Sequence, residues 1–189
     1  MKFYTLDRSV TLEYSKIPIA FRVESMLEVS VVNKGLGGIA LEEKQVDEPY
    51  IKDLDTIPGC SPMEWHLSED PSEWKYIVAI DEGLPVGGIV VTDVREGTVV
   101  HHDYRVVPSY RRTGIGRELM KRALDWSDSQ GCSTILGQNQ NTNVPGCRFM
   151  INQGYNLVGI SIHGLRYIPE LKGETQLLWM MDRSRPGGN

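Results

Sequence analysis

The sequence predicts an α+β fold, in which a mixed and mostly antiparallel sheet is flanked by helices. Three segments of strand length follow one another over residues 74–107 and are separated only by short turns, as in an antiparallel meander. An amphipathic helix follows at residues 115–129, and shorter strands and one further helix alternate after it. With 189 residues, the chain has the length of one domain with one substantial core.

The first third of the chain is predicted to contain one strand and a long irregular segment. Apolar and polar residues alternate from Ile19 to Val32, which indicates a half-buried strand. A glycine-rich turn and a short apolar piece, Ile39–Leu41, follow. Residues 42–73 are acidic and interrupted by prolines, so we interpret them as a substrate-side loop with room for one short helix. Trp65 is the candidate there for lining an acceptor pocket, and the acids either attract a basic acceptor or form a solvated face.

The remaining elements are predicted from the spacing of apolar residues and from residues that typically begin or end helices. Gly131 stands where a glycine ends the helix of residues 115–129. Asn143 is the predicted N-cap of a second helix that runs to Asn152. The predicted strands are Trp74–Ile80, Val86–Val94, Thr98–Val107, Ser133–Leu136, Leu157–Ile162 and Gln176–Met181, and residues 183–189 are expected to be a flexible tail.

Composition excludes some classes of function. The net charge of −5 argues against a general nucleic-acid binder, which needs a clustered basic face, and it favours cationic small molecules. No apolar run approaches the roughly 20 residues that cross a bilayer. The three cysteines show neither zinc spacing nor a disulfide framework. We therefore expect a cytoplasmic protein without nucleic-acid or membrane partners, and a homodimer stays open.

The segment from Arg111 to Arg117 has an unfavourable composition for the start of a helix. Gly114 and Gly116 each cost about 1 kcal/mol relative to alanine in helical turns. Arginines at 111, 112 and 117 put positive charge at the positive end of the helix dipole. A bound phosphate reverses both costs, whereas the alternative is a turn with solvated arginines. The Gly-Lys-Ser/Thr ending of a P-loop is absent, and position 119, where a dinucleotide fingerprint needs its third glycine, is a leucine. The sequence therefore matches neither of these phosphate-binding motifs.

Two motifs carry a resemblance to a known family. The pattern Arg111-x-x-Gly114-x-Gly116, after a strand and before an amphipathic helix, resembles the acetyl-CoA motif of the GNAT superfamily of N-acetyltransferases. The segment from Asn143 to Phe149, followed by Gly154-Tyr155, is similar to a second motif of that family. The resemblance covers about residues 74–182. Within the superfamily, residues 138–141 (Gln-Asn-Gln-Asn) look most like the streptothricin-acetyltransferase-like group.

The resemblance implies a GNAT-type fold whose splayed pair of strands holds acetyl-CoA, with no metal. It implies one N-acetyltransferase domain over residues 1–189, with N-terminal strands and a substrate-side segment (1–73), an acetyl-CoA-binding core (74–182) and the tail. The implied function is acetyl transfer from acetyl-CoA to a primary amine of a small molecule. The alternatives are a catalytically weakened acyl-CoA-binding module, a protein N-acetyltransferase, or a scaffold without a cofactor.

The family also implies site residues. The main chain of Tyr104, Arg105 and Val106 would bind the pantetheine arm, and the Val106 N–H would stabilise the oxyanion. Asn143 would contact the cofactor from the second helix. The tyrosine that often protonates the departing thiolate is replaced by Met150, so Tyr155 is the candidate by residue type, with Tyr104 and Tyr167 as others. The pyrophosphate would be held at Arg111, Arg112, Thr113, Gly114, Ile115, Gly116 and Arg117.

Candidates for a base lie in the strand before the glycine loop. Asp103 is the first candidate for a general base or an ammonium anchor, and it matches an aspartate frequent in the narrower group. His102 and His101 come next, because histidine titrates in the useful range. Strict alternation puts His101, Asp103 and Arg105 on one face and His102 on the other, unless a bulge intervenes. No metal site is expected from the two histidines, and Cys147 is interpreted as a buried thiol.

Overall fold

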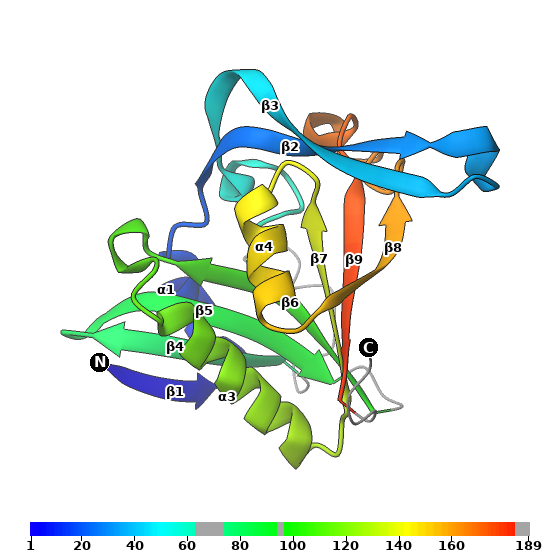
Figure 1. Cartoon of the computed structure of the whole chain (residues 1–189). Helices are drawn as coiled ribbons and strands as arrows, with labels where there is room; N and C mark the ends of the chain where they lie inside the picture. Colours follow the sequence, from blue (N-terminus) through cyan, green and yellow to red (C-terminus); the bar gives the residue numbers. More distant parts are fainter. Residues whose placement is uncertain (63–73, 94–96, 184–189) are drawn as a thin grey trace. The chain divides into compact units, whose positions relative to one another are not determined.

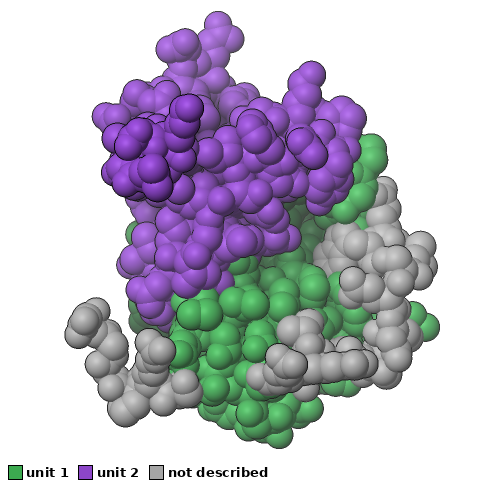
Figure 2. All heavy atoms as spheres, turned by 90° about the vertical axis from the view of Figure 1, so that its right-hand side faces the viewer, with its two compact units in different colours: residues 1–19, 54–137, 180–189 green, residues 20–53, 138–179 purple. Residues whose placement is uncertain are grey.

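A computed structural model describes residues 1–62, 74–93 and 97–183. The chain divides into two compact units, shown in two colours in Figure 2. The first unit contains residues 1–19, 54–137 and 180–189, and the second contains residues 20–53 and 138–179. The candidate acceptor residue Trp65 and the tail after Arg183 lie outside the described residues.

The first unit is built on the predicted meander (Figure 1). Its strands lie in the order β1-β4-β5-β6, followed by β7, and every neighbouring pair is antiparallel except β6 and β7. The meander is confirmed to within two residues at each strand end, but β1 was not predicted. The strands are β1 (Lys2–Leu6), β4 (Trp74–Asp81), β5 (Leu84–Asp93), β6 (Thr98–Val106) and β7 (Thr134–Gln140), of which β7 enters the second unit after Gly137.

Helices of the first unit lie against this sheet. The long helix α3 runs over Ile115–Ser129, as predicted, and Gly131 follows it with a φ of 74°. The short helix α1, Thr11–Ser15, was not predicted. Single 3-10 turns occur at Arg8–Val10, Leu54–Thr56 and Pro108–Tyr110. None of the helices in the described ranges is long and apolar enough to cross a membrane.

Two adjacent glycines in β5 allow both helices to pack closely on the sheet. A Cβ atom added to Gly87 would lie 3.2 Å from the Cγ2 atom of Ile115, in the first turn of α3. A Cβ atom added to Gly88 would lie 2.5 Å from the Cε2 atom of Tyr14, in α1. Adjacent strand residues point to opposite faces, so α3 and Tyr14 cover the two faces at the same point. Gly87 and Gly88 lie opposite Val106 and Arg105 of β6, so both helices meet the sheet beside the candidate site.

The second unit contains a long hairpin of β2 (Phe21–Val31) and β3 (Ile39–Lys52), which pair antiparallel over most of their length. The prediction that residues 42–52 are irregular was therefore wrong. Nearly every residue of β3 is exposed, so no burial pattern of period two marks it in the sequence. Pro49 is tolerated because it lies between Gln45 and Tyr50, where the pairing of β3 with β2 is interrupted.

The rest of the second unit follows the prediction more closely. Helix α4 covers Val144–Asn152, and the side chain of its N-cap, Asn143, accepts a hydrogen bond from the Gly146 N–H at 2.9 Å. The strands of this unit lie in the order β7-β9-β8, where β8 is Asn156–Ser161 and β9 is Gln176–Asp182. Two further 3-10 segments are Val32–Gly35 and Pro169–Leu171.

Candidate active site

Strands β6 and β7 separate after a short stretch of pairing. They are parallel and pair only at Thr98–Val100, against Thr134–Leu136. From His101 to Val106, β6 keeps its antiparallel partner β5 but has no pairing with β7 in the described structure. The main-chain groups on that edge of β6 therefore lie beside no strand, which is the geometry into which an extended ligand fits as an additional strand.

The loop between β6 and α3 presents a run of backbone donors. Arg112 and Gly114 both adopt left-handed conformations, with φ of 66° and 97°, and Gly114 is the N-cap of α3. The first hydrogen bond of the helix is donated by the Glu118 N–H to the Gly114 carbonyl. Among the described residues, the N–H groups of residues 112–117 have no hydrogen-bond partner. Alternating left-handed residues at a helix N-terminus produce a concave nest of donors suited to an anion.

Side chains attach this loop to the end of β6. The Nε of Arg111 donates to the Val106 carbonyl at 2.9 Å, and the hydroxyl of Tyr104 donates to the Gly116 carbonyl. The Thr113 hydroxyl donates to the Tyr110 carbonyl at 2.6 Å. All three contacts end on carbonyl groups, so none of them uses the N–H groups of residues 112–117. Two of the arginines, Arg112 and Arg117, form no ion pair with any described carboxylate and add positive charge at the loop.

An open hollow of about 500 Å³ adjoins the loop. The residues from the loop and the first turn of α3 that line it include Gly114, which has no atom within 4 Å of the position of an added Cβ. The full set of lining residues is Met1, Phe3, Tyr110, Thr113, Gly114, Ile115 and Glu118.

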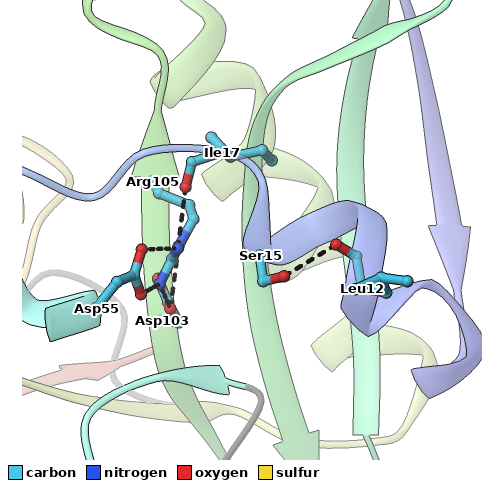
Figure 3. A network of polar contacts seen from close by, with 6 residues as sticks. All are labelled: Leu12, Ser15, Ile17, Asp55, Asp103 and Arg105. Carbon is cyan, nitrogen blue, oxygen red and sulfur yellow. Dashed lines mark hydrogen bonds and ion pairs between the residues drawn. The ribbon is translucent and has the colours of Figure 1, made fainter.

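Arg105 forms the centre of a buried ionic network (Figure 3). Its Nε lies 3.1 Å from both carboxylate oxygens of Asp103, and one terminal nitrogen lies 2.5 Å from Oδ2 of the same residue. The two terminal nitrogens also bind Asp55 at 2.9 and 3.1 Å, and one of them donates to the Ile17 carbonyl at 2.9 Å. The side chain of Arg105 is fully buried, that of Asp103 is 3% exposed, and that of Asp55 is 25% exposed.

The environment shifts the pKa of each buried member of this network. Burial raises the pKa of Asp103, although the neighbouring Arg105 opposes the rise. Burial alone would lower the pKa of Arg105, but the charge and hydrogen bonds of Asp103 outweigh it and raise that pKa. The pKa of Tyr14 lies well above its ordinary value because of burial and the negative charge of Asp103. Arg105 therefore stays charged, while Asp103 is more easily protonated than an exposed aspartate.

A bulge in β6 changes the face on which His102 lies. Val90 of β5 lies opposite Asp103, whereas the next residue, Val91, lies opposite His101, so His102 is the extra residue. The strict alternation predicted from the sequence therefore fails at this position.

The contacts of His102 show which face it occupies. Its ring stacks on Trp74 with centroids 4.5 Å apart, and its Nε2 lies 2.8 Å from the Thr92 hydroxyl. Trp74 belongs to the same core cluster as Val90, the residue opposite Asp103. His102 and Asp103 thus share one face, which corrects the prediction that they lie on opposite faces. Burial lowers the pKa of His102, and that of His101, to about 4.

The candidates from the second motif lie in the second unit. Asn143 uses its amide oxygen to cap α4, and its NH2 group has no acceptor among the described residues. Tyr155 follows α4 and is 3% exposed, and burial raises its pKa. Met150 is buried in α4, and burial raises the pKa of the neighbouring thiol of Cys147 to about 12. Across the described residues, no group of three His, Cys, Asp or Glu side chains could hold a metal ion.

Tyr14 and Asp55 could not be selected as single site residues from the sequence. Asp55 belongs to an acidic segment in which no single acid stands out, and Tyr14 lies in a helix that periodicity did not reveal. The ion pair with Arg105 distinguishes Asp55 from its acidic neighbours. The one available signal was Arg105, which lies in mid-strand two residues after Asp103. Residues i and i+2 of a strand share a face, so this spacing allows an ion pair between them.

Together, a glycine loop with unpartnered donors, the helix that follows it and a separating strand pair define an acyl-CoA-dependent transferase. Residues 39–155 match the model of the acetyltransferase (GNAT) family. The chain therefore belongs to this family, and it is an acetyl-CoA-dependent N-acetyltransferase as the resemblance implied.

Known relatives agree with this assignment. A streptothricin acetyltransferase from Streptomyces lavendulae is 25% identical over 142 residues, which are 75% of this chain and 74% of that protein. The crystal structure of nourseothricin acetyltransferase is similar with a TM-score of 0.79 and 21% identity, and the match covers 96% of this chain and 98% of that chain. A Bacillus anthracis protein crystallised with acetyl coenzyme A is similar with a TM-score of 0.75 and 20% identity, covering the same shares of the two chains. The predicted GNAT-type α+β fold is confirmed.

Proposed function

We propose that this chain transfers the acetyl group of acetyl-CoA to a primary amine of a cationic small molecule of the streptothricin type. The observation that carries the transferase part is the nest of N–H donors over residues 112–117 beside the open edge of β6. The similarity to proteins named streptothricin acetyltransferase supports the type of acceptor. The net charge of −5 also favours a cationic acceptor.

The cofactor roles in this proposal fall mainly on the backbone. The N–H groups from Arg112 to Arg117 hold the pyrophosphate, and the arginines of the loop add charge. The main chain of Tyr104, Arg105 and Val106 receives the pantetheine arm. Arg111 acts indirectly, because its Nε hydrogen-bonds the Val106 carbonyl and so ties the loop to the strand. In the second unit, the NH2 group of Asn143 donates to the cofactor, since its oxygen is committed to the helix cap.

The acetyl transfer requires a neutral amine, a polarised thioester carbonyl and a proton for the leaving thiolate. We assign Asp103 the role of ammonium anchor and base, because burial raises its pKa toward the range in which a carboxylate accepts a proton. His102 is the weaker candidate, since its pKa of about 4 makes it a poor base at neutral pH. A raised pKa keeps Tyr155 protonated, as a proton donor to the thiolate must be.

The second candidate function is a weakened acyl-CoA-binding module, and Met150 is the observation that favours it. Methionine has no proton to donate, and Met150 is buried in α4. A protein N-acetyltransferase is a further alternative to the small-molecule enzyme. Both alternatives predict acetyl-CoA binding without acetylation of a small amine.

One assay separates these functions. Release of the CoA thiol is followed with acetyl-CoA and streptothricin, and the product is identified by mass spectrometry. The proposed function predicts one acetyl group on a primary amine of streptothricin, and loss of the signal in the Gly114→Glu variant. Acetyl-CoA binding by calorimetry without any thiol release from streptothricin would contradict the enzyme and favour the module. Thiol release only with peptides bearing a free N-terminus or lysine would favour the protein N-acetyltransferase.

The domain organisation and the cellular setting belong to the same proposal. We infer that both units form one N-acetyltransferase domain that works in the cytoplasm, without nucleic acid or membrane, and the homodimer remains a prediction. Light scattering of the full chain measures the oligomeric state, and limited proteolysis tests whether the two units resist cleavage together.

A further inference from the structure

The separating strands β6 and β7 form a fork, whose closed end lies within the first unit. The last residues that pair are Val100 and Leu136, so His101 and Gly137 are the first residues beyond the pairing. Both are buried, and His101 is 6% exposed. The open edge of β6 therefore begins at His101.

The imidazole of His101 occupies the space that a side chain at position 137 would need. A Cβ atom added to Gly137 would lie 2.2 Å from both Cε1 and Nε2 of His101. The ring thus extends from β6 to the main chain of β7 and fills the fork where pairing stops. A glycine at position 137 is required for the ring to lie there.

Buried side chains continue the same face of the sheet behind the ring. Val99 and Ile135 are paired and stand two positions before His101 and Gly137, so they lie on the same face. They are 0% and 1% exposed. Burial lowers the pKa of His101 to about 4, so at neutral pH the ring is uncharged and can lie against an apolar group. The open edge of β6 thus ends at an uncharged wall.

The length of this open edge matches that of an acetylated pantetheine arm. From Val106 to His101 the strand rises about 17 Å, at about 3.3 Å per residue. The nest is fixed at the Val106 end, because the Nε of Arg111 donates to the Val106 carbonyl. Acetylated phosphopantetheine has about 15 chain atoms from its ester oxygen to the methyl carbon, as many as about five residues of polypeptide, and it spans about 17 Å when extended. An arm that starts at the nest therefore brings its acetyl group to His101.

We propose that His101, held over Gly137 at the fork, limits the length of the acyl group, so that the enzyme accepts acetyl-CoA and excludes butyryl-CoA, which is two carbon atoms longer. This inference rests on the proposed function, since it requires the pantetheine arm to lie along the open edge of β6. His101 is a specificity-determining residue that contacts the methyl group of the acetyl-CoA. Gly137 is a positioning residue, because its missing side chain leaves the space for the ring.

The test measures binding and not turnover. Calorimetry on the full chain gives the affinities for coenzyme A, acetyl-CoA and butyryl-CoA. In the unaltered chain we expect butyryl-CoA to bind at least about tenfold more weakly than acetyl-CoA, because additional carbon atoms overpack a filled space. In His101→Ala this ratio should fall to about twofold or less. The matched control is His102→Ala, which removes an imidazole from the opposite face of the same strand and should keep the ratio.

A second variant displaces the ring without removing it. Gly137→Ala puts a methyl group where the imidazole lies, so the ring has to move away from β7 toward the open edge. We expect the affinity for acetyl-CoA to fall at least about fivefold relative to that for coenzyme A, which carries no acyl group. An unchanged ratio of these two affinities would contradict the contact between the ring and the acetyl group.

Equal affinities for acetyl-CoA and butyryl-CoA in the unaltered chain overturn the inference, and so does a tenfold ratio that survives in His101→Ala. The comparison on the unaltered chain decides the matter even if a variant does not fold. Gly114→Glu separates this inference from the proposed function. If it weakens both thioesters while the unaltered chain binds them equally, the nest is supported and the role of His101 is refuted. Failure to bind any of the three compounds would contradict the function and the inference together.

Discussion

Arg105 binds the carboxylate of Asp103, which lies two positions before it on β6. Its Nε is 3.1 Å from each carboxylate oxygen. Residues two apart on a strand share a face, so the pair is built into the strand itself. Its second carboxylate, Asp55, comes from a 3-10 turn about 50 residues earlier in the chain. Removal of Asp103 therefore leaves Arg105 paired with Asp55. Removal of Arg105 instead leaves the carboxylates of Asp103 and Asp55 without the guanidinium that binds them both.

Asp103→Asn should separate catalysis from cofactor binding. The variant keeps the size of the side chain and leaves a one-to-one pair of Arg105 and Asp55, so the fold should persist. We expect kcat to fall by about 100-fold or more, which is the usual contribution of a positioned base. The affinity for acetyl-CoA should change by about twofold at most, because its proposed contacts are backbone groups. The measurements are steady-state kinetics from pH 6 to 9 and calorimetry, and unaltered turnover across that range would exclude Asp103 as the base.

Arg105→Met should be strongly destabilising at neutral pH. It leaves the carboxylates of Asp103 and Asp55 without the guanidinium that binds them both, and breaking a buried pair in this way costs about 3–5 kcal/mol. Burial already raises the pKa of Asp103 in the folded state, and loss of the guanidinium, which opposes that rise, raises it further. The penalty is therefore absent below the unfolded pKa and grows as the pH rises through the folded pKa.

Urea denaturation at pH 7 and pH 5 checks this prediction, and the deficit relative to the unaltered chain should shrink at the lower pH. The control is Arg183→Met, which breaks a pair on the surface that is 36% and 51% exposed. Its cost should stay below about 1 kcal/mol. A deficit in Arg105→Met that does not depend on pH would show that lost packing, and not charge, is the cause.

Gly114→Glu should abolish the binding of acetyl-CoA. A Cβ atom added at Gly114 would meet no atom within 4 Å, although the φ of 97° adds backbone strain, and the carboxylate of a glutamate then stands at the anion nest. We expect the affinity to fall by about 100-fold or more, which is the loss of one or two charge-assisted hydrogen bonds.

Two variants separate charge from backbone strain at Gly114. Gly114→Ala has the strain of the left-handed conformation alone, about 1 kcal/mol, and should keep most of the affinity. Gly35→Glu places the same side chain at a glycine with a φ of 102° and open surroundings, in the hairpin of the second unit. Calorimetry on the three variants gives the order of affinities, and an unchanged affinity in Gly114→Glu would remove the phosphate nest.

The sequence was sufficient where local rules agree with burial. Helix α3 was located to the residue because its apolar positions face the sheet and a glycine ends it. The glycine loop stood out because its composition is costly for a helix start unless an anion binds. β3 was missed because its side chains are exposed on both faces, and α1 because five residues are too few for a periodicity.

The ionic network could not be read from the sequence for a different reason. Asp55 and Arg105 are brought together by the tertiary fold, and an acidic segment gives no indication of which acid is buried. The orientation of His102 depends on one extra residue in β6 relative to β5, and a bulge leaves no mark in an alternating pattern. Spacing thus predicted the glycine loop before α3, which is local, better than the network around Arg105, which is assembled from distant segments.

Asn143→Asp should separate the two roles of this residue. An aspartate keeps the oxygen that accepts the Gly146 N–H, so the cap of α4 is retained and stability should change by less than about 0.5 kcal/mol. It replaces the NH2 group by an acceptor and adds a negative charge. We expect at least about tenfold weaker binding of acetyl-CoA, because a donor to the cofactor is lost and a repulsion is gained.

Asn143→Ala provides the contrast, since it loses both the cap and the donor and should cost about 1 kcal/mol of stability. Thermal denaturation and calorimetry on both variants measure the two effects. If Asn143→Asp binds acetyl-CoA as tightly as the unaltered chain, Asn143 serves only as a helix cap.

The two adjacent histidines should make the fold sensitive to acid. Burial lowers the pKa of His101 and of His102 to about 4, below the ordinary value of 6.5. A lowered pKa means that the neutral form is favoured by folding, so the stabilisation is complete above pH 6.5 and is lost as the pH falls toward 4. A difference of this size corresponds to about 3 kcal/mol for one histidine.

Urea denaturation of the unaltered chain and of His102→Gln, at pH 7 and at pH 4.5, measures this contribution as the difference between the two proteins. His102→Gln should narrow the loss of stability between the two pH values, because glutamine does not titrate, although it gives up the stack on Trp74 at both. His163→Gln, at an exposed position, is the matched control and should leave the pH dependence unchanged. Titration of the histidine ring protons by NMR reads the same quantity directly, and a pKa near 6.5 for His102 would show that its ring is hydrated and restore it as a candidate base.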